Sequence, residues 1–213
     1  MIMISVEEAL EKILANVRVL EAEDKSILES PGQVLAEDVY SDTNIPSLDN
    51  SAMDGYAVRA ADTRGASPQS PRVLRVIDTV PAGSISKKQV IPGTAVRIMT
   101  GAPVPEGADS IVRFEDSDEQ ERGRNAGEIG VLCEVPAGKQ IRRAGEDIVK
   151  GTLVLAKGLT IKPAHVGILA SLGKAAVSVI RRPKIAILTT GNELVDIGKP
   201  LTPGKVYNIA TRK

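Results

Sequence analysis

The segment Asp49–Ala57 gathers two carboxylates, an amide and a hydroxyl around a single glycine, shortly after a proline. Asp, Asn and Ser side chains hydrogen-bond to nearby backbone in turns, and glycine tolerates positive φ, so this segment predicts a sharply ordered loop. Its carboxylates suit acid–base chemistry or a hard cation such as Mg²⁺. The alternative is an Asx-rich turn that only tucks Met53 and Tyr56 into the core.

Two further segments combine a turn with polar side chains. In Arg97–Asp109 a strand runs into a Thr-Gly turn and a rigid Pro-x-Pro stretch, which places the Thr100 hydroxyl at a strand end. The alternative there is a hairpin connection stiffened by proline. The segment Thr189–Leu194 directly follows an apolar run. Because ligands of open α/β sheets bind beyond the carboxyl ends of strands, we expect this segment to contribute to a binding site.

The charged segment Ile141–Ile148 contains Arg142 and Arg143 next to two acids. Adjacent guanidinium groups suit a phosphate or another oxyanion, and the acids Glu146 and Asp147 could hold a metal or orient the arginines. The alternative is a hinge between domains that pairs its own charges. The sequence leaves both interpretations open.

Composition limits the chemistry. The formal net charge is zero and the pI is about 6.6, so the chain has no field that attracts polyanions. Aromatic residues make up 2% of the chain, which leaves few platforms for base stacking and argues against nucleic-acid binding. Cys133 is the only cysteine, so an intramolecular disulfide is excluded and a cytoplasmic setting fits. The sequence shows no basic leader and no apolar run of membrane-spanning length, so we expect a soluble chain without a membrane partner.

His165 is the only histidine. It lies among apolar residues in a predicted helix, so we expect it to serve the structure rather than catalysis or zinc binding. Acid–base and metal chemistry then falls to Asp, Glu, Lys, Thr and backbone groups. A metal held by such oxygen ligands would be a hard cation such as Mg²⁺.

Apolar patterning predicts helices at the start of the chain and strands after it. An amphipathic helix is expected over Ser5–Leu20, where Ser5 and Glu8 form a capping box, and a short helix over Pro31–Val39. The charged stretch Asp116–Gly130 predicts a surface hairpin or a mobile loop. Short β-rich runs between Gly and Pro predict the strands Val73–Val80, Ala95–Met99, Ser110–Phe114 and Gly130–Val135.

The last third of the chain predicts a strand at Thr152–Ala156, a helix at Pro163–Leu172 and a strand at Ala176–Ile180. In the run Lys184–Leu188 every residue after the lysine is apolar, as in a strand buried on both faces of a parallel sheet. Such a strand needs neighbouring strands and covering helices. The residues that follow are too few and too rich in Gly and Pro to supply them, so we expect the chain to end inside an α/β domain.

Five pieces, DNSAMDGYA, RIMTGAPVPEGAD, IRRAGED, ASLG and TTGNEL, occur in this order along nearly the whole chain. In order and rough spacing they resemble the molybdopterin molybdenumtransferase family, the MoeA-type proteins related to the E-domain of gephyrin. The resemblance implies a multidomain α+β fold. Its parts would be a discontinuous helical linker domain (1–45 and 146–180), an inserted mostly-β domain (46–145) and the opening strand and loop of an incomplete, MogA-like α/β domain with a parallel sheet (181–213).

The resemblance also implies a reaction. Members of the family insert molybdate into adenylylated molybdopterin and release AMP, with Mg²⁺ as divalent support. Matched positions imply catalytic roles for Asp54, Thr100 and Glu193. They imply metal binding by Asp54 and Glu193. They imply substrate binding by Asp49, Ser51, Arg142, Arg143, Asp147 and Thr190.

Members of the family form elongated homodimers, so the resemblance places Asp54 and Thr100 opposite Glu193 of the partner subunit. Two other functions stay open. One is a non-catalytic dimeric scaffold of the gephyrin E-domain kind. The other is a binding module for molybdate or tungstate.

Overall fold

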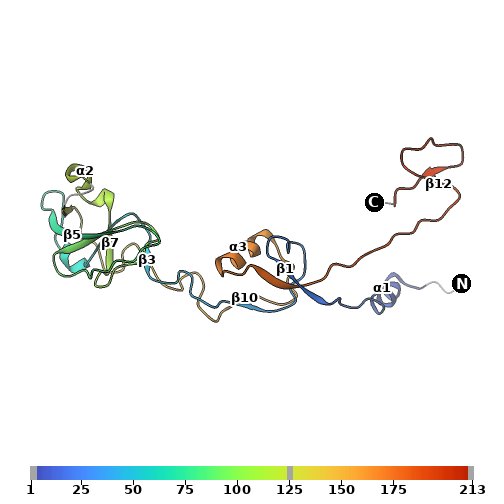
Figure 1. Ribbon diagram of the computed structural model, residues 1–213, viewed down its shortest axis with the longest axis horizontal. Coiled ribbons are helices and arrows are strands. Elements are labelled where there is room, and N and C mark those ends of the chain that lie inside the picture. Colours follow the sequence, from blue (N-terminus) through green and yellow to red (C-terminus); the bar gives the residue numbers. More distant parts are fainter. Residues whose placement is uncertain (1–3, 124–126, 211–213) are drawn as a thin grey trace.

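The computed structural model describes residues 4–123 and 127–210 and shows a mixed α/β chain drawn out along one long axis (Figure 1). Its helices, 3-10 turns included, are α1 (Val6–Leu14), η1 (Ala60–Thr63), η2 (Phe114–Asp116), α2 (Glu119–Arg122) and α3 (Pro163–Ser171). Its strands are β1 (Ala22–Ser26), β2 (Val39–Tyr40), β3 (Asn50–Ser51), β4 (Gly55–Val58), β5 (Arg72–Val80), β6 (Thr94–Ile98), β7 (Ser110–Arg113), β8 (Glu128–Val131), β9 (Ile141–Arg142), β10 (Leu153–Leu155), β11 (Ala176–Ile180), β12 (Leu194–Val195) and β13 (Val206–Tyr207).

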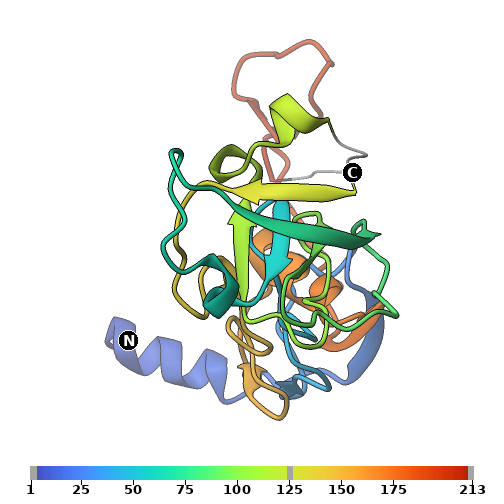
Figure 2. The same ribbon diagram turned by 90° about the vertical axis from the view of Figure 1, so that its left-hand side faces the viewer.

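One end of the molecule is built around a five-stranded sheet with the order β7-β4-β6-β5-β8, which Figure 2 views from that end. β5 and β6 run parallel, and the other neighbours are antiparallel. Successive residues of β4 point to opposite faces, as the strand period of two requires. Tyr56 and Val58 pack into one hydrophobic cluster and Ala57 into another, so the sheet has an apolar core on both faces.

A second core lies in the middle of the molecule (Figure 1). There β1 pairs with β11, β2 pairs with β10, and Leu35, Leu169 and Val179 are fully buried. The two cores are joined by a pair of chain segments that meet at Ile45, whose N–H donates to the carbonyl of Ile148 at 2.8 Å. The separate cores support a division into 1–45 with 146–180 and an inserted 46–145, which stays a prediction.

Most predicted elements are confirmed. Val73–Val80, Ala95–Met99, Ser110–Phe114, Thr152–Ala156 and Ala176–Ile180 correspond to β5, β6, β7, β10 and β11, and Pro163–Leu172 to α3. The strand expected at 130–135 begins and ends earlier, as β8. At the start of α3, the backbone N–H of Lys162 donates to Nδ1 of His165 at 3.1 Å, so the histidine helps to cap the helix.

The helix predicted at Pro31–Val39 is wrong. The chain turns at Gly32, which has φ of +80°, and then forms isolated β-bridges from Val34 to Thr160 and from Leu35 to Val179. The segment does not form a helix because its backbone groups bond instead to residues near 160 and in β11. Leu35 is fully buried there.

The amphipathic helix is confirmed in type but is shorter than predicted. It begins with half of the expected capping box: Ser5 Oγ accepts from the N–H of Glu8 at 3.0 Å, whereas the Glu8 carboxylate accepts from Lys12 Nζ at 2.8 Å. None of its residues is buried. Val6 and Ile13 on its apolar face are 79% and 61% exposed, and both views show α1 standing apart from the two cores (Figures 1 and 2). The apolar stripe is therefore not covered by the described part of this chain.

The buried strand predicted at Lys184–Leu188 is also wrong. These residues carry no strand assignment, and Ile185, Ile187 and Leu188 are 78%, 63% and 90% exposed. A strand needs hydrogen-bonded neighbours, and within residues 4–123 and 127–210 none pairs with this run. Residues 181–210, hereafter the arm, leave β11 as extended chain and carry only the short parallel pair β12–β13 (Figure 1).

The hairpin or mobile loop predicted at Asp116–Gly130 is replaced by η2, α2 and the start of β8, and residues 124–126 lie outside the described residues. Glu119, the first residue of α2, is buried. No helix among the described residues has the length and apolar character to cross a bilayer.

Candidate functional site

Three of the polar segments found in the sequence lie side by side on the sheet end. β3 sits between two of them. On one side it pairs with β9, which places Asn50 opposite Arg142. On the other side Ser51 exchanges backbone hydrogen bonds with Gly101 and Ala102, at 2.8 and 2.9 Å. Residues 49–54, 100–104 and 141–147 therefore form one polar surface, hereafter the polar site.

The side chain of Asp54 is held by Thr100. Its Oδ1 accepts from both the backbone N–H and the hydroxyl of Thr100, at 2.7 and 2.8 Å. These two bonds, the backbone bond first, hold the pKa of Asp54 below its usual range. Among the described residues Oδ2 has no recorded partner, and the residue is exposed. Asp54 is therefore an ionised carboxylate with one oxygen fixed and the other turned to solvent.

Two local features of the sequence make this geometry possible. Gly55, directly after Asp54, packs against the backbone of β7, where an added Cβ would lie 2.0 Å from the carbonyl oxygen of Val112. Ser51 is buried, and its hydroxyl donates to the carbonyl of Met53 at 2.5 Å. The hydroxyl of Ser51 thus closes the turn rather than facing solvent.

The two arginines of the polar site are paired with carboxylates of the same chain. Arg143 Nη1 donates to Asp49 Oδ2 at 2.5 Å, and Arg142 Nη2 donates to Asp147 Oδ2 at 2.6 Å. The N–H of Ala144 also donates to Asp49, and together with Arg143 it lowers the pKa of that carboxyl. Arg142 thus pairs within its own segment and Arg143 pairs with the Asp49 segment, so an oxyanion would have to compete with Asp49 and Asp147 for the guanidinium groups.

Thr190 and Glu193 are exposed and lie on the arm. Glu193 directly precedes β12, at the far end of the long axis from β3 and the polar site (Figure 1). Its carbonyl accepts from the N–H of Val206 at 2.8 Å, which fixes the backbone but not the carboxylate. Within one described chain, the structure does not bring these two residues to Asp54.

The described residues contain no group of three Asp, Glu, His or Cys side chains that could enclose a metal ion. Mg²⁺ often takes one or two protein carboxylates and keeps several waters, so the solvent-facing oxygen of Asp54 fits it as a single ligand. The other ligands would have to be water, substrate oxygens or groups outside the described chain.

Sequence reasoning missed a buried ion pair next to Asp54. Arg97 Nη2 lies 2.8 Å from Glu119 Oε1, and the two side chains are 11% and 7% exposed. The guanidinium carbon also sits 4.3 Å from the ring centroid of Phe114, which meets Tyr56 edge-on. The sequence did contain a signal for this pair: Arg97 lies between Val96 and Ile98 in the predicted strand before Thr100. The pair anchors α2 to the sheet at Arg97, which precedes Thr100 by three residues.

The mixed α/β fold is similar to that of solved MoeA structures. The molybdopterin biosynthesis moeA protein from Pyrococcus horikoshii OT3 superposes with a TM-score of 0.80 at 38% sequence identity, over 93% of this chain and 51% of that one. Residues 4–173 match the family described as the MoeA N-terminal region (domain I and II). The chain belongs to this family.

Curated relatives agree. A protein named molybdopterin molybdenumtransferase 2 from Mycobacterium tuberculosis is 44% identical over 85% of this chain and 44% of its own length. The molybdopterin molybdenumtransferase of Bacillus subtilis is 39% identical over 96% of this chain and 47% of its own length. The chain thus spans about half the length of the curated relatives it matches.

Proposed function

We propose that this chain is part of an enzyme of molybdenum cofactor biosynthesis, which inserts molybdate into adenylylated molybdopterin and releases AMP. The names of the relatives support the substrate class, since they describe molybdopterin molybdenumtransferases. The observation that carries the proposal is the Asp54–Thr100 contact, which keeps one carboxylate oxygen fixed and presents the other to solvent.

The chain's own residues would bind and orient. Thr100 holds Asp54 ionised, so its free oxygen can accept a hydrogen bond from the substrate or hold Mg²⁺ together with water. Bound there, Mg²⁺ would neutralise negative charge on a phosphoanhydride. Arg142 and Arg143 would offer their remaining N–H donors to the substrate, with Asp49 and Asp147 fixing the guanidinium planes. Ser51 would shape the turn that presents Asp54.

We further propose that the working protein is a cytoplasmic homodimer. The separation of the polar site from Thr190 and Glu193 along one chain (Figure 1) supports a site completed by Glu193 of the partner subunit. The finer domain description belongs to the same proposal: a discontinuous linker domain, an inserted β domain and the beginning of a MogA-like domain.

The test is AMP release from adenylylated molybdopterin in the presence of molybdate and Mg²⁺, measured on this chain and on a longer chain that contains it. In the active form Asp54→Ala should lower the rate at least about a hundredfold, because the group that meets the charged substrate is gone. Its free energy of unfolding should change by no more than about 0.5 kcal/mol, since Asp54 is exposed. Thr100→Val is the graded companion, because it keeps the carboxylate and removes one of its two bonds.

AMP release by neither chain would contradict the transferase proposal and favour the scaffold or the oxyanion-binding module. Unfolding of Asp54→Ala would show that the carboxylate serves the turn, and the functional role given to it would be wrong.

A further inference from the structure

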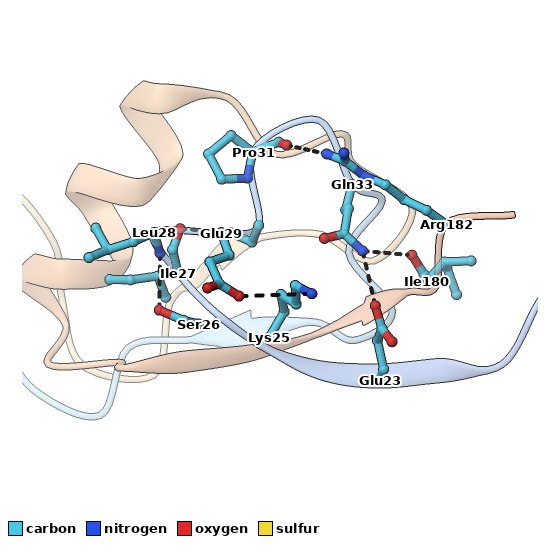
Figure 3. A network of polar contacts seen from close by, with 11 residues as sticks. Glu23, Lys25, Ser26, Ile27, Leu28, Glu29, Pro31, Gln33, Ile180 and Arg182 are labelled. Atoms are coloured by element: carbon cyan, nitrogen blue, oxygen red, sulfur yellow. Dashed lines mark hydrogen bonds and ion pairs between the residues drawn. The ribbon is translucent and has the colours of Figure 1, made fainter. Parts of the chain in front are cut away.

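A cavity of about 380 Å³ lies beside the β1–β11 pair, where the chain leaves β11 (Figure 3). It is separate from the polar site and uses none of the residues that the family resemblance singles out. Its lining residues are Glu23, Lys25, Glu29, Gln33, Arg181, Arg182 and Lys184.

Gln33 belongs to the buried part of this cavity. It is 3% exposed, and its Nε2 donates to the carbonyl of Ile180 at 3.3 Å and to Glu23 Oε1 at 3.4 Å. Figure 3 shows the amide between Glu23 and the segment that carries Arg182. Because the amide is held by both strands of the β1–β11 pair, one side of the cavity rests on the packed core, and the first residues of the arm, Arg181, Arg182 and Lys184, line the other.

The cations of the cavity outnumber its acids and are unequally neutralised. Arg181 is paired with Glu21, at 2.9 Å. Lys25 has a long contact of 3.8 Å with Glu29. Arg182 donates to a backbone carbonyl, that of Pro31, at 2.9 Å.

Lys184 has no recorded hydrogen bond or ion pair among residues 4–123 and 127–210. A guanidinium carries five N–H donors, so Arg182 keeps most of its own available. Two positive groups of the cavity, Arg182 and Lys184, therefore have no carboxylate partner, while Glu23 and Glu29 provide acceptors on the same wall as Lys25.

We propose that this cavity binds a phosphate monoester of a small polyol, such as a sugar phosphate. Arg182 and Lys184 would contact the phosphate oxygens, and the carboxylates of Glu23 and Glu29 would accept from the hydroxyl groups. A fork of guanidinium donors matches a tetrahedral oxyanion, and a flexible ammonium adds charge. The volume lies in the range of small-molecule sites, about 300–1,000 Å³. The two acids disfavour a ligand that is anionic throughout, and the zero net charge of the chain gives no pull on polyanions.

Calorimetric titration of the chain with ribose 5-phosphate and with inorganic phosphate tests the proposal. Ribose 5-phosphate should bind saturably and at least about fivefold more tightly than phosphate, because only the ester offers sugar hydroxyl groups to the acids. The double variant Arg182→Gln/Lys184→Gln should weaken ribose 5-phosphate binding at least about tenfold. The control Lys87→Gln/Lys150→Gln, which removes the same charge from exposed positions outside the cavity, should change it less than about twofold.

Two further variants separate the parts of the proposal. Glu29→Gln should weaken ribose 5-phosphate about threefold or more and leave inorganic phosphate within about twofold. Asp54→Ala should leave the affinities for ribose 5-phosphate and for inorganic phosphate unchanged, because Asp54 does not line the cavity. The binding test can therefore succeed or fail independently of the transferase proposal.

Absence of saturable binding, or equal binding by the cavity variant and its control, would overturn the site. Equal affinity for ribose 5-phosphate and inorganic phosphate would overturn the assignment to a monoester.

Discussion

The sheet end and the arm are both rich in apolar residues, yet they place them differently. On the sheet Val58, Val96 and Ile111 are fully buried, whereas Ile187 and Leu188 on the arm are 63% and 90% exposed. The difference lies in the partners. The five strands of the sheet satisfy each other's backbone and cover each other's side chains, and the arm has only the two-residue pairing of β12 with β13.

The comparison extends to the candidate site residues. Asp54, Thr100, Asp49 and the two arginines have fixed partners because the sheet end holds their backbones. The side chains of Thr190 and Glu193 are carried by chain that has no core beneath it. A residue type that suits chemistry thus acquires geometry only where its segment is packed.

The largest expected effect is the loss of the buried ion pair on the sheet. Glu119→Ala leaves the Arg97 guanidinium buried without its carboxylate, and we expect a loss of about 3–5 kcal/mol in the free energy of unfolding. Asp196→Ala on the arm removes a contact with Lys199 whose side chains are 69% and 67% exposed, and should shift the urea midpoint far less than Glu119→Ala does. Urea unfolding followed by circular dichroism measures both, and similar losses would break the comparison.

Next in size is a matched pair of apolar truncations. Ile111→Ala, on the core-facing side of β7, should cost about 2–5 kcal/mol because it removes packed methyl groups and leaves a cavity. Ile187→Ala, on the arm, should change the unfolding free energy by about 0.5 kcal/mol or less. If Ile187→Ala were as costly in the same urea experiment, the arm would be packed in solution.

The smallest effect concerns acid pH at the polar site. The pKa of Asp54 is lowered by its bonds to Thr100, so its stabilising contribution is present above the unfolded pKa of about 3.9 and is lost as pH falls through the lower folded pKa. Asp54→Asn should flatten the fall in stability below about pH 4, by less than about 1 kcal/mol because the carboxylate is exposed.

Thr100→Val should flatten that fall less than Asp54→Asn does, since the backbone N–H of residue 100 still donates. Urea midpoints between pH 2 and 6 make this comparison. If Asp54→Asn and the unchanged chain had identical pH profiles, Asp54 would make no contribution to the acid transition.

Local patterning was sufficient for elements whose own residues determine them. Val73–Val80 is rich in β-branched residues and is bounded by Pro71 and Pro81, and Pro163 opens a helix that Gly173 ends with φ of +73°. Predictions from local patterning failed where partners far along the chain determine the structure. Residues 31–39 became turns and bridges because strand partners lie more than a hundred residues away, and 184–188 stayed exposed because such partners are missing from the described chain.

For the polar site, the sequence indicated the residue types but not their contacts. Asp54 and Thr100 are 46 residues apart, and no local pattern reports that one accepts two bonds from the other. The choice between oxyanion binding and internal pairing for Arg142 and Arg143 was equally beyond sequence reasoning, because it depends on where Asp49 falls in the fold. Their roles in the reaction stay predictions.

The place of β3 between two later segments also sets an order in time. Asp49 bonds to Arg143 across 94 residues of chain, so this contact carries a large loop-closure entropy that the pairing of the intervening strands offsets. During synthesis the loop around Asp54 would leave the ribosome early and then wait, first for Thr100, which bonds to Asp54, and later for the residues near 140. The polar surface is therefore assembled late, and a nascent chain cannot engage a ligand there before the sheet beneath it is complete.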